Sequence, residues 1–347
     1  MKLTFWGMVS DQWTTIPPVV TTDLTGKIVV VTGSNIGLGL ETAKHFARMD
    51  PGKLIVACRS KEKGLAAVAD IKRDTGCSSV EFMRLDLADF DSVKSFAHEF
   101  ESQNERLDIL VENAAVALYD PKPQFTKDGW EVTAQVNHLA TSLLGLLLLP
   151  VMAETSKKFN TRPRLVVVSS GLHDHAKFEK KIIDSSKPLR DYAHKDDVDP
   201  NLRIVAGRYS ESKLLNIYFS RALHEHLPPQ SALVVNSVTP GFCYSGLRRD
   251  YPLTGVRGLV MWLMEKTLAW TSEEGSRSLV YASLGEEEEA DKMKGVYVSS
   301  LGAIYEPSDH VLGEEGAKEQ RIFWDDTVKE LTKVDPRVEQ IMKDYLR

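Results

Sequence analysis

Residues 27–49 read KIVVVTGSNIGLGLETAKHFARM, in which an apolar β-branched run passes through a glycine-rich turn into a segment of helical period. A strand, a glycine turn and a helix N-terminus in this order can hold the pyrophosphate of a dinucleotide, because backbone N–H groups and the helix dipole favour anions. We expect Gly33 to permit the tight turn, Gly37 to let the backbone approach the phosphates, and Gly39 to let the helix pack on the strand. Since turns use glycine freely, this interpretation depends on the flanking strand and helix.

The same alternation of short Val- and Ile-rich runs with longer helical segments continues along the chain, which is typical of βαβ units. We therefore predict an α/β fold: a doubly wound (Rossmann) seven-stranded parallel sheet with helices on both faces. A single domain would span residues 24–300, with an N-terminal extension at 1–23 and a C-terminal helical extension at 301–347. The predicted strands span residues 27–33, 53–59, 80–86, 108–114, 164–170, 232–238 and 295–300.

Two segments interrupt this alternation. Residues 171–206 are polar and charged, and they form an insertion between the fifth strand and the next helix. Residues 242–273 include VRGLVMWLMEKTLAW, whose large apolar face either packs in the core or covers a substrate. Because ligands of open parallel sheets bind beyond the carboxyl ends of the strands, we favour a hydrophobic substrate lid.

The composition excludes several classes of protein. The 347 residues carry a net charge of -6, so there is no basic excess to hold nucleic acid. The longest apolar run, residues 143–153, contains Pro150 and is too short for a bilayer, which predicts a buried helix and no integral membrane span. Three widely separated cysteines indicate a reducing compartment. With no secretory signal pattern at the N-terminus, we expect a cytoplasmic protein.

The second predicted strand ends at Arg59, where dinucleotide-binding folds place the residue that meets the adenosine ribose. A guanidinium suits a 2′-phosphate through forked hydrogen bonds, so NADP(H) is predicted in preference to NAD(H), which stays possible. The alternative is a surface arginine without a ligand. Asp86, at the end of the third strand, could accept from the adenine amino group or cap the next helix.

Tyr209 and Lys213 lie four residues apart in a segment of helical period, so both side chains project from one face. An adjacent ammonium favours the phenolate and brings the pKa of a tyrosine toward neutral pH, where it can exchange protons. Roughly one such pair arises by chance in a chain of this composition. The pair indicates a catalytic site because it follows the glycine loop and the polar residues Asn137 and Ser170 along the chain.

This order of features resembles the short-chain dehydrogenase/reductase family over residues 24–300. The stretches ENAAV at 112–116 and QVNHLATSLLGLLLLP at 135–150 look most like its retinol-dehydrogenase-like and related fungal branches. So does the long spacing between the predicted catalytic serine and tyrosine.

The resemblance implies a role for each of four residues. Tyr209 would be the general acid or base, and Ser170 would hold the substrate oxygen. Lys213 would tune Tyr209 and bind the ribose, and Asn137 would support a water that relays protons to Lys213. Of the two adjacent serines we choose Ser170 over Ser169, because alternation along the strand turns only one toward the cleft and the family uses the second. Alternatively, Asn137 only bridges backbone, and both serines only end a strand.

Two departures from the family pattern stand out. Where the family has Asn-Asn-Ala-Gly, this chain has Glu112 in place of the first Asn and Ala115 in place of the Gly, while Asn113 is kept. The added methyl of Ala115 could alter affinity for the adenosine ribose.

The second departure is the length of the insertion at 171–206, which contains His173 and His175. No third ligand has matching spacing, so we expect exposed loop histidines and no metal. We expect the insertion to shape specificity or to block a contact between subunits.

After the sixth strand, TPGFCYSGL offers Pro240 and Gly241 followed by Ser245, which resembles the family's turn at the nicotinamide amide. The full set of predicted cofactor contacts is Gly33, Ser34, Asn35, Ile36, Gly37, Leu38, Gly39, Arg59, Asp86, Leu87, Asn113, Ala114, Ala115, Tyr209, Lys213, Pro240, Gly241 and Ser245.

The sequence thus predicts an NADPH-dependent oxidoreductase that interconverts a hydrophobic ketone or aldehyde and its alcohol, as a monomer or homodimer. One alternative is a nonenzymatic dinucleotide sensor on the same fold. Another is a retinol-type dehydrogenase at a membrane surface, suggested by the apolar lid segment and the tryptophans of the N-terminus.

Overall fold

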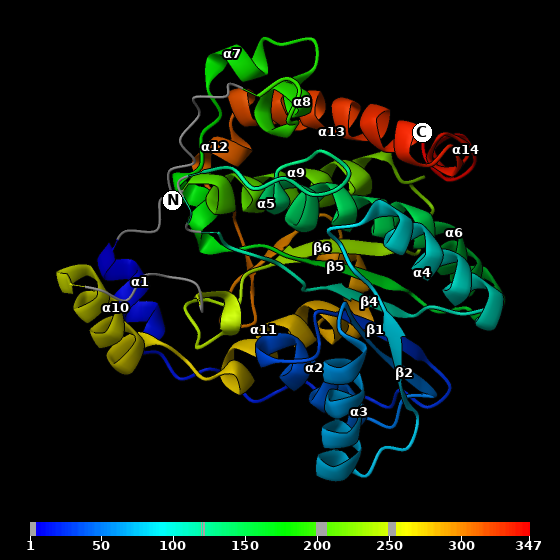
Figure 1. Cartoon of the computed structure of the whole chain (residues 1–347). Coiled ribbons are helices and arrows are strands. Elements are labelled where there is room, and N and C mark those ends of the chain that lie inside the picture. Colours follow the sequence, from blue (N-terminus) through cyan, green and yellow to red (C-terminus); the bar gives the residue numbers. More distant parts are fainter. Residues whose placement is uncertain (1–4, 119, 121, 199–206, 249–254) are drawn as a thin grey trace.

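The protein folds around one eight-stranded sheet (Figure 1), seen in a computed structural model that describes residues 5–118, 120, 122–198, 207–248 and 255–347. The strand order is β3-β2-β1-β4-β5-β6-β7-β8, and all neighbours are parallel except β7 and β8. The strands are β1 (Ile28–Thr32), β2 (Lys53–Cys58), β3 (Val80–Arg84), β4 (Ile109–Glu112), β5 (Arg164–Val168), β6 (Val234–Val238), β7 (Tyr297–Val298) and β8 (Ile304–Tyr305).

The eighth strand corrects the predicted sheet of seven parallel strands. β8 pairs antiparallel with β7 across a tight turn, in which Gly302 has φ +66° and Ser299 N donates to Ala303 O at 2.8 Å. β7 is only two residues long, shorter than the predicted strand at 295–300. Strands of two residues carry no readable alternation, so the sequence indicated only helix beyond residue 300.

Helices cover both faces of the sheet, as predicted: α4, α6 and α9 on one face, and α2, α3 and α11 on the other (Figure 1). Because the strands bury residues on both sides, each face has its own hydrophobic core. The helices are α1 (Phe5–Gln12), α2 (Gly37–Ala47), α3 (Lys61–Thr75), α4 (Phe90–Gln103), α5 (Val132–Ala134), α6 (Ala140–Phe159), α7 (Lys180–Ile183), α8 (Pro188–Ala193), α9 (Gly207–His226), α10 (Gly255–Leu268), α11 (Ser272–Leu284), α12 (Asp309–Leu312), α13 (Glu314–Val334) and α14 (Arg337–Tyr345).

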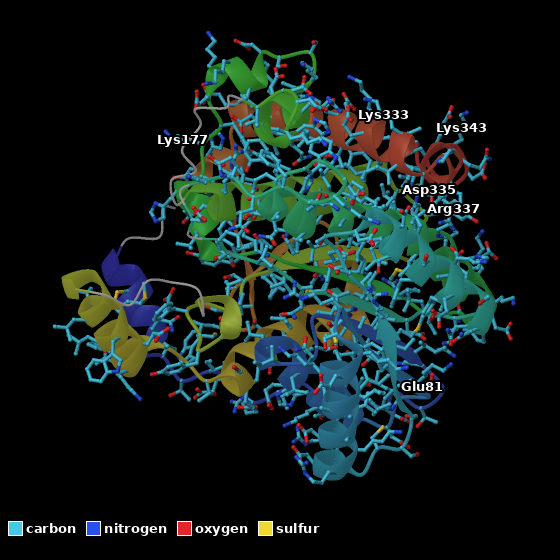
Figure 2. The ribbon with its side chains drawn as sticks, in the orientation of Figure 1. Glu81, Lys177, Lys333, Asp335, Arg337 and Lys343 are labelled. Carbon is cyan, nitrogen blue, oxygen red and sulfur yellow. The ribbon has the colours of Figure 1, made fainter. Side chains whose placement is uncertain are left out.

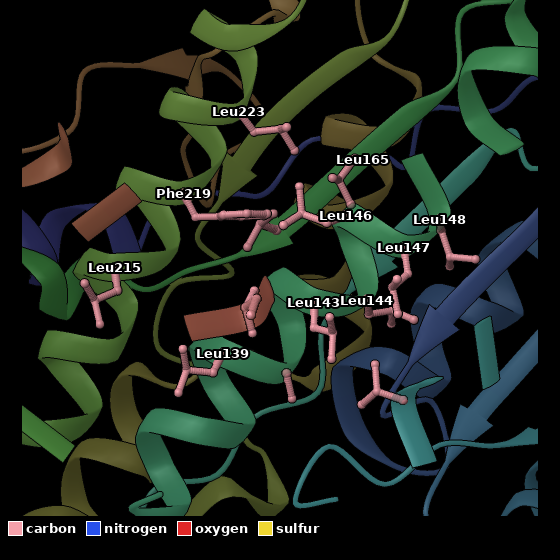
Figure 3. Packing of buried hydrophobic residues seen from close by; sticks show 14 of the residues in the cluster. Leu139, Leu143, Leu144, Leu146, Leu147, Leu148, Leu165, Leu215, Phe219 and Leu223 are labelled. Carbon is pink, nitrogen blue, oxygen red and sulfur yellow. The ribbon is translucent and has the colours of Figure 1, made fainter. Parts of the chain in front are cut away.

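The long apolar segment forms a core helix. By length and composition, the continuous helix Val132–Phe159 could cross a membrane, but 83% of its most apolar window is buried inside the protein. Its leucines, including Leu146, share one hydrophobic cluster with Phe219 and Leu223 of α9 (Figure 3). Pro150 lies within α6 and does not end it.

The insertion and the C-terminal helices form an additional layer. The described part of the insertion contains a 3-10 turn, η2 (Gly171–His175), followed by α7 and α8; its residues 199–206 lie outside the described chain. α13 and α14 pack over α9 and α6, and Leu189 N of α8 donates to Asp326 Oδ2 of α13 at 2.8 Å. Charged side chains such as Lys333 and Lys343 project outward from this layer (Figure 2).

Candidate active site

The turn between β1 and α2 has the shape that its glycines predict. Gly33 (φ +66°) and Gly37 (φ +62°) adopt a backbone conformation that L side chains rarely take. A Cβ at Gly39 would lie 2.6 Å from Gly33 O, so the helix can approach the turn only with glycine there. A Cβ at Gly37, by contrast, would have Ser272 Oγ at 3.9 Å as its nearest neighbour, which leaves room for a ligand.

α2 begins at this turn without a side-chain cap. Its N-cap residue, Ile36, makes no capping hydrogen bond with its side chain. The first N–H groups of a helix need acceptors, and together with the helix dipole they attract an anion. Open space at Gly37 and uncapped donors fit the pyrophosphate of a dinucleotide.

A cavity of about 1030 Å³ runs along the carboxyl ends of the strands, as expected for a doubly wound sheet. It brings together most of the predicted site residues, from the glycine loop to the tyrosine and lysine of α9. Those that line it are Gly33, Asn35, Ile36, Gly37, Leu38, Gly39, Arg59, Asp86, Leu87, Asn113, Ala114, Ala115, Ser170, Tyr209, Lys213, Pro240, Gly241 and Ser245.

Two predicted residues do not line the cavity. Ser34 is fully buried, and its hydroxyl donates to Val31 O at 2.6 Å. Asn137 lies in a π-helical turn, η1 (Gln135–Leu139); its Oδ1 accepts from Val116 N at 2.8 Å, and its Nδ2 donates to Ser212 Oγ at 3.0 Å. Asn137 therefore bridges the loop after β4 to α9.

Two cations, Arg59 and Lys63, line the end of the cavity at which the sequence predicts the adenosine. Arg59 is exposed, and no described residue forms an ion pair with it. Lys63, in the first turn of α3, lines the same end together with Ser60, whose Oγ accepts from Lys63 N at 3.3 Å. Sequence reasoning missed both residues, although they follow Arg59 directly in RSKEK. Asp86 does not cap the next helix, because Asp89 is the N-cap of α4.

Asn113 acts on the glycine loop through its hydrogen bonds. Its Nδ2 donates to Thr32 O at 2.9 Å, while Asn113 N and Ala114 N both donate to Thr32 Oγ1 at 3.0 Å. Thr32, which the sequence analysis missed, therefore fixes the end of β1 to the end of β4. The only signal was a threonine placed directly before the first glycine.

Glu112, one of the two departures from the family pattern, is buried in β4 away from the cavity lining. A Cβ built on Gly145 of α6 would lie 3.3 Å from its Oε1, so the carboxyl faces that helix. Burial raises the pKa of Glu112 well above its usual value, against a smaller opposing effect of the Gly145 backbone N–H. Its effect is on the core, whereas Ala115 does line the cavity.

The two serines after β5 have different partners. Ser169 is 1% exposed, and its hydroxyl donates to Lys213 O at 2.8 Å. Ser170 Oγ instead accepts from Leu172 N at 3.2 Å, and no described residue accepts its hydrogen. A hydroxyl has one hydrogen to donate, so Ser170 retains a donor for a ligand in the cavity.

Tyr209 and Lys213 both line the cavity from α9, as their spacing predicts. Lys213 Nζ lies 5.6 Å from the centroid of the Tyr209 ring and donates to Val168 O at 2.7 Å. The lysine is 1% exposed, and burial lowers its pKa to about 7. Near neutral pH its charge therefore depends on pH, and so does its influence on Tyr209.

The predicted lid, 242–273, forms α10 at the mouth of the cavity. Met261 and Met264 line the cavity, whereas Trp262 and Leu263 are 51% and 46% exposed. The helix therefore covers the cavity with one face and leaves an apolar face uncovered, rather than packing in the core. Residues 249–254 of the segment lie outside the described chain.

The N-terminal extension holds this lid in place, a role that the sequence did not show. Gln12 of α1 donates from Nε2 to Phe242 O and to Leu268 O, both at 2.8 Å, and its Oε1 accepts from Phe242 N at 3.1 Å. Three hydrogen bonds from one amide thus tie α1 to both ends of the lid. Gln12 also lines the cavity.

One of the two histidines of the insertion differs from the prediction of exposed loop residues. His175 is exposed, but His173 is buried and 3% exposed. His173 Nδ1 lies 2.8 Å from Ser170 O, and Ser308 N donates to His173 Nε2 at 3.1 Å. Within the described chain, no group of three His, Cys, Asp or Glu residues could hold a metal ion.

The last part of the cavity wall begins at the end of the predicted domain, at residues 299 and 300, and continues beyond it. We call it the C-terminal wall; it consists of Ser299, Ser300, Leu301, Ala303, Tyr305 and Glu306. It follows from the unpredicted hairpin of β7 and β8, which turns the chain back across the cavity.

Comparison with known proteins gives the relatives of the chain. Residues 27–185 match the family model for short chain dehydrogenase. The short chain dehydrogenase/reductase dmxR8 of Cryptosporiopsis sp. (strain 8999) is 35% identical, covering 92% of this chain and 95% of its own. The short-chain dehydrogenase anuD of Penicillium roqueforti (strain FM164) is 34% identical, covering 93% and 82%.

Solved structures share the fold at lower identity. The RhlG/NADP complex of Pseudomonas aeruginosa has a TM-score of 0.60 at 20% identity, covering 80% of this chain and 95% of that chain. L-sorbose reductase of Gluconobacter frateurii, complexed with NADPH and L-sorbose, has a TM-score of 0.59 at 18% identity, covering 83% and 98%. Fold, glycine loop and nearly full-length relatives agree: the chain belongs to the short-chain dehydrogenase/reductase family, in its fungal branch.

Proposed function

We propose that this oxidoreductase uses NADPH to interconvert a hydrophobic ketone or aldehyde and its alcohol, with Tyr209 as the general acid or base. One observation carries the proposal: Ser170, Tyr209 and Lys213 line the same cavity as the glycine loop and Arg59. A bound nicotinamide dinucleotide would supply the hydride. The residues of the chain would supply orientation and the proton.

Ser170 and Tyr209 would act together at the substrate oxygen. The Ser170 hydroxyl, which already accepts from Leu172 N, has its hydrogen available for the negative charge that develops there during reduction. Tyr209 would donate its phenolic proton to that oxygen in reduction and take it back in oxidation. A charged Lys213 beside the ring favours the phenolate that remains.

The lining of the cavity supports a hydrophobic substrate. Leu172, Leu247, Met261 and Met264 contribute apolar side chains around its mouth. Methionine side chains adapt to ligands of irregular shape, which suits a lid over a bulky carbonyl compound.

Replacement of Tyr209 tests the reaction. Tyr209→Phe keeps the ring but removes the proton, so turnover should fall about 10²- to 10⁴-fold while the Kd for NADPH stays within about twofold. Turnover would be measured against aldehydes, ketones and quinones, and Tyr244→Phe, outside the cavity lining, serves as the control. Wild-type turnover in Tyr209→Phe would show the role to be wrong. NADPH binding by the wild type with no turnover of any compound would favour the dinucleotide sensor.

The cofactor preference depends on Arg59 and Lys63. Two cations at the adenosine end suit a 2′-phosphate, and structural neighbours have been solved with NADP or NADPH. Arg59→Ala should raise the KM for NADPH about tenfold or more, because charge-assisted hydrogen bonds contribute roughly 1.5–3 kcal/mol. The KM for NADH, which lacks the phosphate, should change less than about twofold. A wild-type protein that preferred NADH would contradict the assignment.

A membrane-surface enzyme is the second candidate, and the uncovered face of α10 favours it. Leu259, Val260, Trp262 and Leu263 are each 46–57% exposed, and an apolar helix face with an indole can enter the headgroup region of a bilayer. Sedimentation with phosphatidylcholine vesicles tests this, with Trp262→Ser/Leu263→Ser as the variant and Leu65→Ser, an exposed leucine of α3, as the control. Protein that stays in the supernatant would favour a reductase that acts free of membranes.

A further inference from the structure

His173 is a buried histidine to which the proposed chemistry gives no role. It lies three residues after Ser170, at the start of the insertion, and its ring meets the edge of Tyr297 at 5.1 Å between centroids. Its two nitrogens face two different segments: Nδ1 faces Ser170 O at the end of β5, and Nε2 faces Ser308 N before α12. One side chain thus joins the predicted catalytic strand to the C-terminal part of the chain.

These two partners determine which nitrogen of His173 carries the proton. A carbonyl oxygen only accepts, so Nδ1 must donate to Ser170 O; a backbone N–H only donates, so Nε2 must accept from Ser308 N. The neutral Nδ1–H tautomer meets both demands. Asp174 Oδ1, 3.1 Å from Nε2, favours a second proton, but burial outweighs it and lowers the pKa of His173.

The bond to Ser170 completes a set of contacts that fix this peptide. Ser170 O accepts from His173 Nδ1 at 2.8 Å and also from His173 N at 3.1 Å. The following N–H, that of Gly171, donates to Thr239 Oγ1 at 3.1 Å. The Thr239 contact ties this peptide to the end of β6, whereas the histidine side chain is the contact among these that ties it to the C-terminal part of the chain.

The other segment belongs to the substrate cavity. Ser308 follows Tyr305 and Glu306 of the C-terminal wall by two to three residues. Its N–H is bound to His173, and its position therefore fixes the end of that wall. A shift of His173 would change the position of the Ser170 hydroxyl, which is predicted to bind the substrate oxygen, relative to the C-terminal wall.

We propose that His173 is a positioning residue, whose neutral Nδ1–H tautomer holds Ser170 in register with the C-terminal wall of the substrate cavity. The proposal rests on the proposed function, in which the Ser170 hydroxyl acts on the substrate oxygen. It predicts that loss of His173 impairs the reaction without impairing cofactor binding, because its side-chain hydrogen bonds within the described residues go to Ser170 and Ser308 and not to the glycine loop.

Three substitutions separate the two hydrogen bonds. His173→Asn keeps a donor near Nδ1 for Ser170 O, His173→Gln keeps an acceptor nearer Nε2 for Ser308 N, and His173→Leu keeps neither. His173→Leu should lower kcat roughly 10- to 100-fold, the scale of a misplaced reacting group, while the Kd for NADPH stays within about twofold. His173→Asn should recover most of kcat, and His173→Gln should mainly raise the KM for the carbonyl substrate. His98→Leu, an exposed histidine of α4, is the control.

Two results would overturn the proposal. One is a folded His173→Leu protein whose kcat is within twofold of the wild type. The other is His173→Asn and His173→Leu proteins that bind NADPH normally but are equally impaired, since the donor to Ser170 O would then be irrelevant. Failure of the proposed function has a different signature, because it would appear as unchanged turnover in Tyr209→Phe.

A spectroscopic arm does not depend on finding a substrate. In ¹⁵N-histidine-labelled protein, the resonances lost in His173→Leu identify this residue among the nine histidines. Long-range ¹H–¹⁵N correlations at pH 7 should show the neutral Nδ1–H tautomer. An Nε2–H tautomer or an imidazolium at that pH would contradict the arrangement.

Discussion

At the residue scale, Glu112 shows how a departure from the family pattern can act on stability. Its carboxyl is buried in β4, and burial raises its pKa well above the usual value. Above the ordinary pKa of a glutamate, about 4.3, the unfolded chain releases this proton while the folded protein keeps it. The free energy of unfolding should therefore fall as the pH rises above that value.

Glu112→Gln removes the titration and keeps the shape. We expect the variant to have a higher Tm than the wild type at pH 8 and a smaller difference at pH 5, because only the wild type pays for a neutral carboxyl at high pH. Thermal unfolding at both pH values measures this, with Glu99→Gln, an exposed residue of α4, as the control. If the Tm of Glu112→Gln exceeded that of the wild type by less at pH 8 than at pH 5, the pH dependence would have the opposite sign to the one predicted.

The residues of the site show what a sequence can and cannot tell. The glycine loop, Arg59, Ser170, Tyr209 and Lys213 were predictable, since each follows from its place at a strand end or on one helix face. Thr32 and Gln12 were not, because their roles come from hydrogen bonds to residues about 80 and 230–256 positions away. Asn137 was predicted as a site residue, and its hydrogen bonds to Val116 N and Ser212 Oγ, which the sequence does not show, tie the loop after β4 to α9.

At the scale of elements, the π-helical turn η1 connects the helices that cover the sheet to α13 and α14, which we call the C-terminal layer. His138 of η1 is 2% exposed, and its Nε2 lies 3.0 Å from Thr327 Oγ1 of α13. Burial lowers the pKa of His138 to about 3. Between that value and about 6.5, the unfolded chain binds a proton that the folded protein does not.

The protein should therefore lose stability in acid, because the unfolded chain gains a proton at His138 that the folded protein does not. As the pH falls from about 6.5 toward 3, this group should reduce the free energy of unfolding by on the order of 1 kcal/mol per pH unit. His138→Gln should be less stable at pH 7 but should lose less stability between pH 7 and pH 4.5, as measured by urea unfolding. His98→Gln should follow the wild type. If His138→Gln and the wild type lost the same free energy of unfolding between pH 7 and pH 4.5, His138 would not be the source of the acid sensitivity.

The elements themselves were predictable where their pattern is long. The strands of the sheet centre and the apolar α6 follow from runs of Val, Ile and Leu. β8 and the π-helical turn were missed, because two or five residues are too short for their periodicity to be read. The helices of the insertion were missed because packing against α13 stabilises them, as in the bond from Leu189 N to Asp326.

At the scale of the whole molecule, α13 and α14 act as part of the fold. Trp324 of α13 is 4% exposed, and its ring stacks on His226 of α9 at 4.7 Å between centroids and lies 5.9 Å from Phe219. A large aromatic side chain buried between two layers contributes strongly to stability. The C-terminal layer should therefore unfold together with the sheet.

Trp324→Ala should lower the free energy of unfolding by about 3–5 kcal/mol, because it opens a cavity between α9 and α13. Trp262→Ala, at a 51% exposed position of α10, is the matched control and should change it by less than about 0.5 kcal/mol. Denaturant unfolding followed by circular dichroism compares the two. If Trp324→Ala lowered the free energy of unfolding by no more than the small loss expected for Trp262→Ala, α13 would not be integral to the fold.

The contact of α1 with the lid has a consequence for synthesis on the ribosome. Gln12 is bound to the carbonyl of Leu268, which is added 256 residues later. At about 5–20 residues per second, the first helix spends roughly 10–50 s of translation without its partner. The glycine loop emerges early and α10 late, so a nascent chain has the glycine loop long before it has the helix that covers the cavity.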